Sequence, residues 1–316
     1  MLRRIPADGL LTVCVISWGL NFTATKYAQE HGFTPLAYAA PRLALAALLL
    51  SAIAARRERD APRMGAADLG RAVAVGAVLV FGNQLSFGFS FHFASAAVIA
   101  LLFGTMPIVA LLLSAALGLE CVRPLQWLAA AVSFAGVGLV AAGAHGGGNS
   151  SALGIVLGLT SPFTFVVYSL ALAPLVRRHG AFRVNALACS AAAIPLLGVS
   201  IPALASLDWG HVTALAWLCL GFSAAAFALP NLLWFIAIDR VGAARATLWA
   251  NAQPFAGTLF AVLILAERIG SLTYIGGGVL AVGIVLARLR RGEGPSAARG
   301  AEPESELALA AVPPHE

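Results

Sequence analysis

Long apolar runs alternate with short polar breaks along almost the whole chain. Each run holds about 20 residues, the length that an α-helix needs to cross the roughly 30 Å hydrocarbon core of a bilayer. A charged segment at 56–60 and a glycine-rich segment at 146–150 mark the clearest breaks. The pattern predicts membrane-spanning helices over residues 9–28, 34–55, 69–91, 95–118, 124–144, 152–174, 183–204, 212–238, 243–266 and 271–290.

Composition supports the same class of protein. Of the 316 residues, 60% are hydrophobic and only 11% are charged, whereas soluble domains carry roughly 25% charged residues. Arg3 and Arg4 precede an apolar run as they would in a signal peptide, but the run continues through Trp18 and Phe22 without a small-residue cleavage site, so the first helix is expected to be retained. The sequence therefore predicts an all-α integral membrane protein with ten transmembrane helices.

The two halves of the chain repeat each other at a constant offset of 147 residues. Among the residues that recur unchanged at this offset are Pro107 with Pro254, Glu120 with Glu267 and Gly136 with Gly283. Because each half contains five predicted helices, an odd number, the second half must enter the membrane from the opposite side. We predict two inverted five-helix repeats around a central cavity, over residues 9–144 and 152–290, followed by a disordered cytoplasmic tail over 291–316.

Arginine and lysine positions orient the predicted helices, because basic residues are retained on the cytoplasmic side. With the N-terminus inside, only Lys26 and Arg268 fall outside, and Arg42 lies within the second helix. The basic residues on the inside are Arg3, Arg4, Arg56, Arg57, Arg59, Arg63, Arg71, Arg123, Arg177, Arg178, Arg183, Arg240, Arg245, Arg288, Arg290, Arg291 and Arg299. The sequence therefore predicts a multi-pass protein of the bacterial inner membrane with both termini cytoplasmic. The basic residues that give the net charge of +6 therefore reflect membrane topology and do not indicate a nucleic-acid-binding surface.

Several of these features together resemble the EamA-type family of the drug/metabolite transporter superfamily. They are the opening helix with residues 17–22 (Ser-Trp-Gly-Leu-Asn-Phe), Arg42 in the second helix, and the helices with Pro107 and Pro254 that each run to a glutamate followed by a glycine-rich helix. The resemblance covers roughly residues 10–290. It implies a ten-helix fold of two repeats, a central substrate cavity, and export of amino acids or other metabolites.

Polar and aromatic side chains near the middle of the predicted helices are the candidate substrate-binding residues. A polar side chain is costly in lipid, so at this depth it should face a partner or a water-filled cavity. The alternative is that such residues only hold helices together. The candidates are Trp18, Asn21, Arg42, Asn83, Gln84, Phe87, Thr105, Pro107, Ser161, Thr164, Tyr168, Asn231, Trp234, Asn251 and Pro254.

Two kinds of candidate have specific physical roles. Pro107 and Pro254 each remove a backbone hydrogen bond, and broken helices at matching repeat positions are typical of transporter sites. Arg42 has three open roles: binding a substrate carboxylate, pairing with a helix end, or extending to the membrane surface. The other charged residues, among them Lys26 and Glu267, are expected at helix ends as anchors or structural residues.

The sequence offers no support for a cofactor, a metal ion or catalysis. Cys14, Cys121, Cys189 and Cys219 lack metal-site spacing, the histidines lack an HExxH motif, and no glycine loop precedes a lysine as in a phosphate-binding loop. An intramembrane enzyme, a passive channel and a scaffold are therefore minor alternatives to a transporter. The expected partners are a small-molecule substrate and the lipid bilayer, with the protein a monomer or a homodimer.

The substrate and the driving force are inferred from what the middle of the membrane contains. Amides, hydroxyls and aromatic rings without a carboxylate favour a neutral or zwitterionic solute such as an amino acid over a cation. A proton-coupled transporter needs a titratable group in the cavity. Since no Asp or Glu lies near the middle of a predicted helix, we expect facilitated transport or exchange, with His92 and Asp239 as the groups that would change this expectation.

Overall fold

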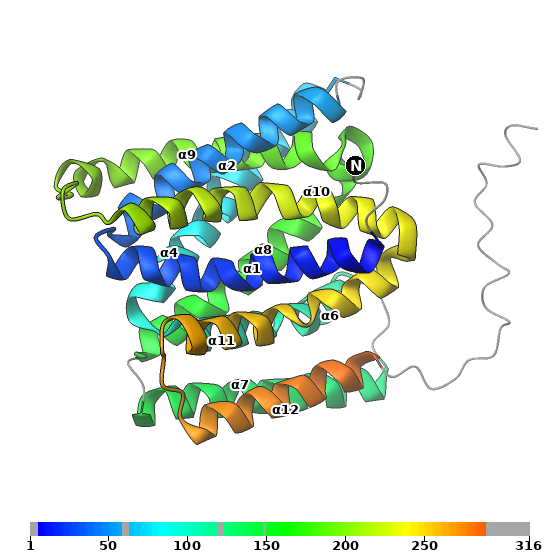
Figure 1. Ribbon diagram of the computed structural model, residues 1–316. Helices are drawn as coiled ribbons and strands as arrows, with labels where there is room; N and C mark the ends of the chain where they lie inside the picture. Colours follow the sequence, from blue (N-terminus) through cyan, green and yellow to red (C-terminus); the bar gives the residue numbers. More distant parts are fainter. Residues whose placement is uncertain (1–5, 59–62, 119–122, 148–149, 289–316) are drawn as a thin grey trace, which may run out of the picture.

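The computed structural model describes residues 6–58, 63–118, 123–147 and 150–288, and these residues form helices joined by short turns (Figure 1). The expected tail over 291–316 lies outside the described residues, and so does Glu120. The helices are α1 (Ala7–Glu30), α2 (Pro35–Arg57), α3 (Ala66–Val75), α4 (Phe81–Phe93), α5 (Ala96–Phe103), α6 (Met106–Ala116), α7 (Pro124–Gly147), α8 (Ala152–His179), α9 (Ala181–Ala205), α10 (Ala214–Ala250), α11 (Gln253–Ile264) and α12 (Ser271–Arg288). A π turn, Gly76–Val80, joins α3 to α4.

Within the described residues, eight helical segments are long and apolar enough to cross a membrane. The continuous segments Ala66–Phe93 and Ala96–Ala116 each count as one of them, and two shorter apolar helices, Gln253–Ile264 and Ser271–Ala287, follow. Large apolar side chains such as Leu48 and Ile194 are exposed on the surface. Lipid tails cover such side chains without cost, so the exposed surface suits a multi-pass membrane protein.

Side-chain caps explain where several helices begin. The hydroxyl oxygens of Thr34, Ser95, Ser151 and Thr213 each accept a hydrogen bond from the backbone N–H three residues later. Such a cap satisfies one of the N–H groups that the first turn of a helix leaves without a partner. The helices therefore start next to the short polar breaks of the sequence.

One predicted break is wrong. Separate helices were expected over 212–238 and 243–266, but α10 runs without interruption from Ala214 to Ala250. The intervening segment contains Asp239 and Arg240 but no proline, and charged residues do not interrupt a helix when water or headgroups solvate them. The chain breaks instead at Asn251 and Ala252, just before Pro254. In Figure 1 the ribbon curves at this end of α10 and turns back into α11.

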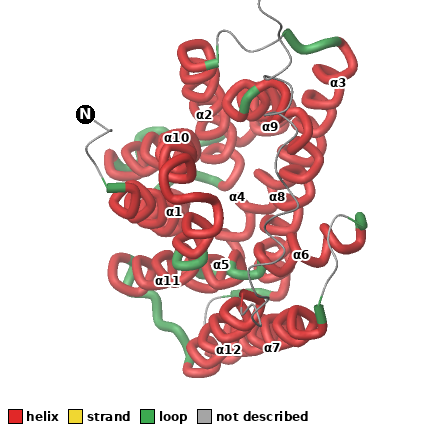
Figure 2. The backbone as a smooth tube through the Cα atoms, turned by 90° about the vertical axis from the view of Figure 1, so that its right-hand side faces the viewer, coloured by secondary structure: helices red, strands yellow, loops and turns green. Residues whose placement is uncertain are grey.

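The helices pack mainly in four pairs: α7 with α12, α2 with α9, α1 with α10, and α4 with α8. Figure 2 shows the α7–α12 pair at one edge of the molecule and the α2–α9 pair at the opposite edge. A Cβ atom built on Gly143 would meet Thr273, and one built on Gly136 would meet Leu280. Since the residue number rises along α7 as it falls along α12, these two helices are antiparallel.

Charged residues distinguish the two ends of the bundle. At one end, which we call the basic end, the carboxylate of Glu58 accepts hydrogen bonds from the backbone N–H groups of Phe182 and Arg183, and Asp68 pairs with His179 at 2.8 Å. The opposite end, the lysine end, contains Lys26. Figure 1 shows the start of α1, the end of α2 and the end of α12 on the same side of the molecule. The described chain thus begins and ends at the basic end.

Candidate functional site

Two chain breaks at matching positions face each other across the bundle. The first separates α5 from α6 at Gly104 and Thr105, and the second separates α10 from α11 at Asn251 and Ala252. A proline two residues later accounts for each break, because its ring clashes with the carbonyl four residues earlier and it donates no hydrogen bond. For Pro107 that earlier residue is Phe103, and for Pro254 it is Ala250, the last residues of α5 and α10.

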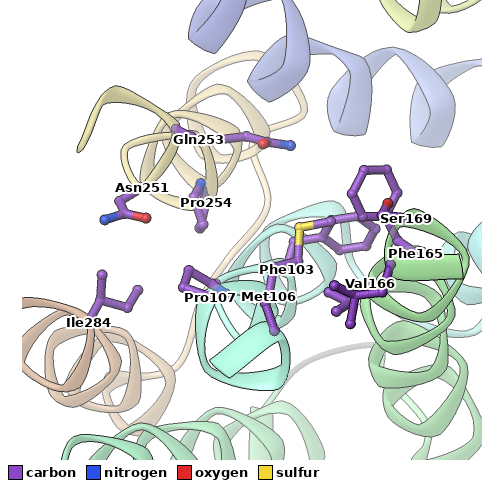
Figure 3. Close-up of a pocket in the computed structure, with 14 residues that line it drawn as sticks. Phe103, Met106, Pro107, Phe165, Val166, Ser169, Asn251, Gln253, Pro254 and Ile284 are labelled. Atoms are coloured by element: carbon purple, nitrogen blue, oxygen red, sulfur yellow. The ribbon is translucent and has the colours of Figure 1, made fainter. Parts of the chain in front are cut away.

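A cavity of about 360 Å³ lies between these breaks. Figure 3 shows Pro107 and Pro254 pointing toward each other from the two breaks, with Asn251 and Gln253 beside Pro254. Of the candidate residues from the sequence, Pro107, Asn251 and Pro254 line this cavity. The remaining lining residues are Phe103, Gly104, Met106, Ala110, Phe165, Val166, Ser169, Leu170, Ala250, Gln253 and Ile284. The lining is therefore mostly apolar, with two side-chain amides and one hydroxyl.

For most of the lining residues that were not candidates, nothing in the sequence indicated a place at the cavity. Phe103, Val166 and Ile284 are apolar residues in apolar helices, so their sequence does not distinguish a cavity from lipid or from the core. Phe165 is the repeat counterpart of Trp18. That correspondence is the one signal that pointed to it.

A second group of candidates surrounds Arg42, whose side chain is only 2% exposed. Its Nη2 donates a short hydrogen bond to Oε1 of Gln84, and its guanidinium carbon lies 5.2 Å from the ring centroid of Phe87. Tyr38, Tyr168 and Cys189 lie within electrostatic reach of the guanidinium. Arg42 therefore extends neither to the membrane surface nor, in the part of the chain that the structure describes, to a helix end.

The amides of Gln84 and Asn83 extend this group to α8. Gln84 donates from Nε2 to Oδ1 of Asn83 at 3.0 Å. Asn83 in turn donates from Nδ2 to the Ser161 backbone oxygen at 2.6 Å and lies 3.2 Å from the Thr164 hydroxyl. The π turn Gly76–Val80 immediately precedes these residues, and π turns are frequent next to functional sites. Arg42, Gln84, Asn83, Ser161 and Thr164 thus form one continuous polar network, which we call the Arg42 network.

A third group lies between α1 and α10. The rings of Trp18 and Trp234 are 5.3 Å apart, and the side chain of Asn21 accepts a short hydrogen bond from Ser223. Asn231 lies on α10 as well, but its amide donates to the Phe227 oxygen of its own helix at 2.7 Å. The contacts of Trp18 and Asn21 join helices of the two halves. None of the residues in this group lines the cavity of Figure 3.

Aromatic rings connect the Arg42 network to the cavity. Phe87, which lies under the guanidinium of Arg42, is 5.8 Å from Phe103 by ring centroids, and Phe103 lines the cavity. Phe22 also packs against Phe103, at 5.0 Å. Thr105 lies in the break next to Phe103 and uses its hydroxyl to bind the Leu102 oxygen. Two rings therefore stand between the buried charge and the open space.

The lysine end is tied together by hydrogen bonds to helix ends. Lys26 donates to the oxygens of Phe91 and Ala94 at 2.7 and 3.3 Å, where α4 ends. The carboxylate of Glu267 accepts from the N–H groups of Ala96 and Ala97 at 2.7 and 2.9 Å, where α5 begins. Burial raises the pKa of Glu267 above the ordinary glutamate value, although these two N–H groups act in the opposite direction.

Comparisons with known proteins agree with this architecture. The model of the EamA-like transporter family matches the chain twice, over residues 5–142 and 152–289. An uncharacterized transporter of Archaeoglobus fulgidus is 24% identical over 284 residues, covering 89% of this chain and 98% of the relative. A crystal structure for which no activity is stated has a TM-score of 0.61 at 20% identity, covering 89% of this chain and 96% of that chain, and it supports the fold alone. The chain belongs to the EamA-like transporter family, and with its apolar helices it is a multi-pass membrane transporter.

Proposed function

We propose that the protein moves a small organic metabolite across the membrane by alternating access between two inverted copies of one five-helix unit. The observation that carries this proposal is the pair of breaks before Pro107 and Pro254, which occupy equivalent positions in the two copies and line one cavity. Broken helices free backbone groups to bind a solute and allow half-helices to move. In this proposal the C-terminal part of α10 with α11 forms the ninth crossing and α12 forms the tenth.

Contacts between equivalent helices support the inverted arrangement. The antiparallel pair α7 and α12 consists of repeat counterparts, and their contacts are reciprocal: Gly136 packs on Leu280, and Gly283, the counterpart of Gly136, packs on Ser133, the counterpart of Leu280. A pseudo-two-fold axis between the helices produces this reciprocity. When the axis lies in the membrane plane, the two copies have opposite orientations.

The distribution of charge supports an orientation with the basic end in the cytoplasm. Arg56, Arg57, Arg177, Arg178 and Arg183 lie at or next to the basic end. Basic residues in short loops are retained on the cytoplasmic side. We therefore propose that both termini are cytoplasmic, in a bacterial inner membrane.

The lining of the cavity favours a neutral or zwitterionic amino acid as the solute. Apolar rings and aliphatic groups fit a side chain, while Asn251, Gln253 and Ser169 offer hydrogen bonds to polar groups. Export is the direction that the family resemblance suggests. Asp239 follows the apolar span Ala214–Trp234, and its side chain lies outside the described ones. Since no carboxylate lies in the middle of a span among the described side chains, the proposed mode is facilitated transport or exchange.

Flux in liposomes tests this proposal. Purified protein in proteoliposomes should take up labelled leucine with saturation, and unlabelled leucine inside should accelerate the uptake. Ala110→Phe, which fills the cavity, should abolish most of this flux, whereas Ala116→Phe on the exposed face of the same helix should not.

Three results would contradict the proposal. Absence of flux for a whole panel of labelled metabolites would exclude transport of such solutes. Unsaturable flux without acceleration by internal solute would indicate a passive channel. Uphill accumulation driven by a pH gradient and abolished by His92→Ala or Asp239→Asn would show proton coupling instead of facilitated transport.

A further inference from the structure

Arg42 is a buried positive charge whose hydrogen bonding is incomplete. Its Nη2 donates a hydrogen bond to the amide oxygen of Gln84, but its Nε–H has no hydrogen-bond partner within the described chain. None of the carboxylates in the described segments pairs with it, and the titratable groups that face it, Tyr38, Tyr168 and Cys189, are neutral in their usual state. A guanidinium that is removed from water without an anion is costly, so the site favours the arrival of a negative group.

The second copy has no arginine at the equivalent position. The two copies share one architecture, and the position equivalent to Arg42 in the second copy is Cys189, which is buried on α9 and faces α2. A structural need common to both copies would be met in both. Since the α2–α9 pair brings the two equivalent positions into electrostatic reach, the single charge lies near the pseudo-two-fold axis.

We infer that Arg42, with Gln84 beside it, is the subsite that binds the carboxylate of a small amphipathic monocarboxylate. This inference rests on the proposed function, and it assigns the substrate class and the residue that selects it. Guanidinium offers planar, charge-assisted hydrogen bonds that match a carboxylate. The Gln84 oxygen holds the guanidinium in place when the subsite is empty, and the ligand's carboxylate takes over as acceptor.

The position of the subsite sets the orientation of the ligand. Phe87 and Phe103 lie between Arg42 and the cavity, so their rings have to move aside for the carboxylate to reach the guanidinium. The rest of the ligand remains among the apolar side chains of the cavity, such as Met106 and Val166. The ligand therefore has one negative end and an apolar body of limited size.

Matched acids and amides test the carboxylate subsite by binding alone. The probes are leucine with leucinamide, phenylalanine with phenylalaninamide, and phenylacetate with phenylacetamide, titrated into the purified full-length protein in detergent. At least one acid should bind about tenfold or more tightly than its amide, the loss expected when one charge-assisted hydrogen-bonded pair is removed. Arg42→Gln should remove this difference by weakening the acid and not the amide.

Gln84→Glu separates a binding role from a structural one. The new carboxylate pairs with the guanidinium, so acid binding should fall about tenfold or more. The melting temperature should change little, because the gained ion pair is offset by the loss of the Nε2 donor to Asn83. Gln126→Glu introduces the same charge at a surface position of α7, where its oxygen still accepts from Arg123, and should leave both quantities unchanged. If Arg42 has only a structural role, Gln84→Glu leaves acid binding as in the wild type.

Two patterns of results distinguish this inference from the proposed function. If no acid binds more tightly than its amide, or if Gln84→Glu leaves acid binding intact, the carboxylate subsite is wrong even where flux in liposomes is present. If acid binding depends on Arg42 and flux is absent, the subsite stands and the transport proposal fails.

Discussion

Charged side chains in this protein satisfy backbone groups at places where the chain leaves or enters a helix. Lys26, the sole lysine of the sequence, binds the carbonyl oxygens at the end of α4 and also pairs with Glu30 at 3.4 Å. Glu267 binds the N–H groups at the start of α5, where the helix dipole favours a negative charge. These contacts connect α1, α4, α5 and the α11–α12 loop at the lysine end, so an opening of this end has to break them.

The raised pKa of Glu267 makes the stability of the protein depend on pH in a defined direction. A carboxyl group whose pKa is higher in the folded state favours folding most at pH values below its unfolded value, about 4.3. Its contribution is lost as pH rises through the raised pKa. The melting temperature of the wild type relative to Glu267→Gln should therefore fall as pH increases from about 4 to about 7.

Thermal unfolding of the two proteins in detergent at several pH values checks this prediction. Asp208→Asn provides a control, because Asp208 is a fully exposed carboxylate of the lysine end. Its pKa is lowered by the hydrogen bond from His211, so its contribution runs in the opposite direction. If the melting temperature of the wild type relative to Glu267→Gln rises with pH instead, the hydrogen bonds from the N–H groups of α5 lower the pKa of Glu267 more than burial raises it.

At the scale of helices, close packing between α7 and α12 depends on glycine. A Cβ atom on Gly136 would lie 2.6 Å from the Leu280 nitrogen and 2.8 Å from the Gly276 oxygen, which are both backbone atoms. Gly138 lies two residues further along α7 with open space where its side chain would be. Small residues allow membrane helices to approach each other closely. The sequence alone does not show which of the glycines lies at the contact.

Gly136→Ala should destabilise the protein, because the two helices must separate to accommodate the methyl group. Overpacking of this kind costs about 1–3 kcal/mol. Gly138→Ala should be neutral or slightly stabilising, since alanine is the better helix former by about 1 kcal/mol. Thermal unfolding in detergent measures both, and equal melting temperatures for the two variants would contradict the antiparallel contact described above.

The sequence predicted most helices within a few residues, but it could not predict how the second half is interrupted. The first helix, for example, was expected over 9–28 and extends over Ala7–Glu30. Hydropathy marks where the chain leaves the apolar part of the membrane, whereas a helix ends only where its hydrogen bonds end. Asp239 and Arg240 mark where the chain leaves the apolar part of the membrane, whereas Pro254 accounts for the end of the helix.

Of the residues that line the cavity, the sequence singled out Pro107, Asn251 and Pro254, and it did not single out the others. Asn83, Gln84 and Arg42 drew notice because polar groups are rare in apolar spans, and the structure brings them into one network. A candidate contacts the cavity only if its helix is rotated toward it and the two breaks place it there. The spacing of residues along the sequence predicts neither of these. The substrate-binding role of these residues stays a prediction.

At the scale of the molecule, the two family matches give the protein its main architectural feature. They cover residues 5–142 and 152–289, so equivalent positions in the two copies are related by the same offset that the sequence shows. His31, which follows α1, corresponds to Arg178 at the end of α8. His31 lies at the lysine end, where its oxygen accepts from Thr213, and Arg178 lies at the basic end beside Asp68 at 3.9 Å.

Labelling of this equivalent pair tests the inverted arrangement most directly. The measurement uses a variant in which Cys14, Cys121, Cys189 and Cys219 are replaced, so that His31→Cys or Arg178→Cys supplies the one thiol. A membrane-impermeant maleimide applied to intact cells should label the protein with His31→Cys, and it should label the protein with Arg178→Cys only after the membrane is permeabilised. Labelling of both positions from the same side in intact cells would contradict the opposite orientation of the two copies. It would also contradict the proposed alternating access, which depends on that orientation.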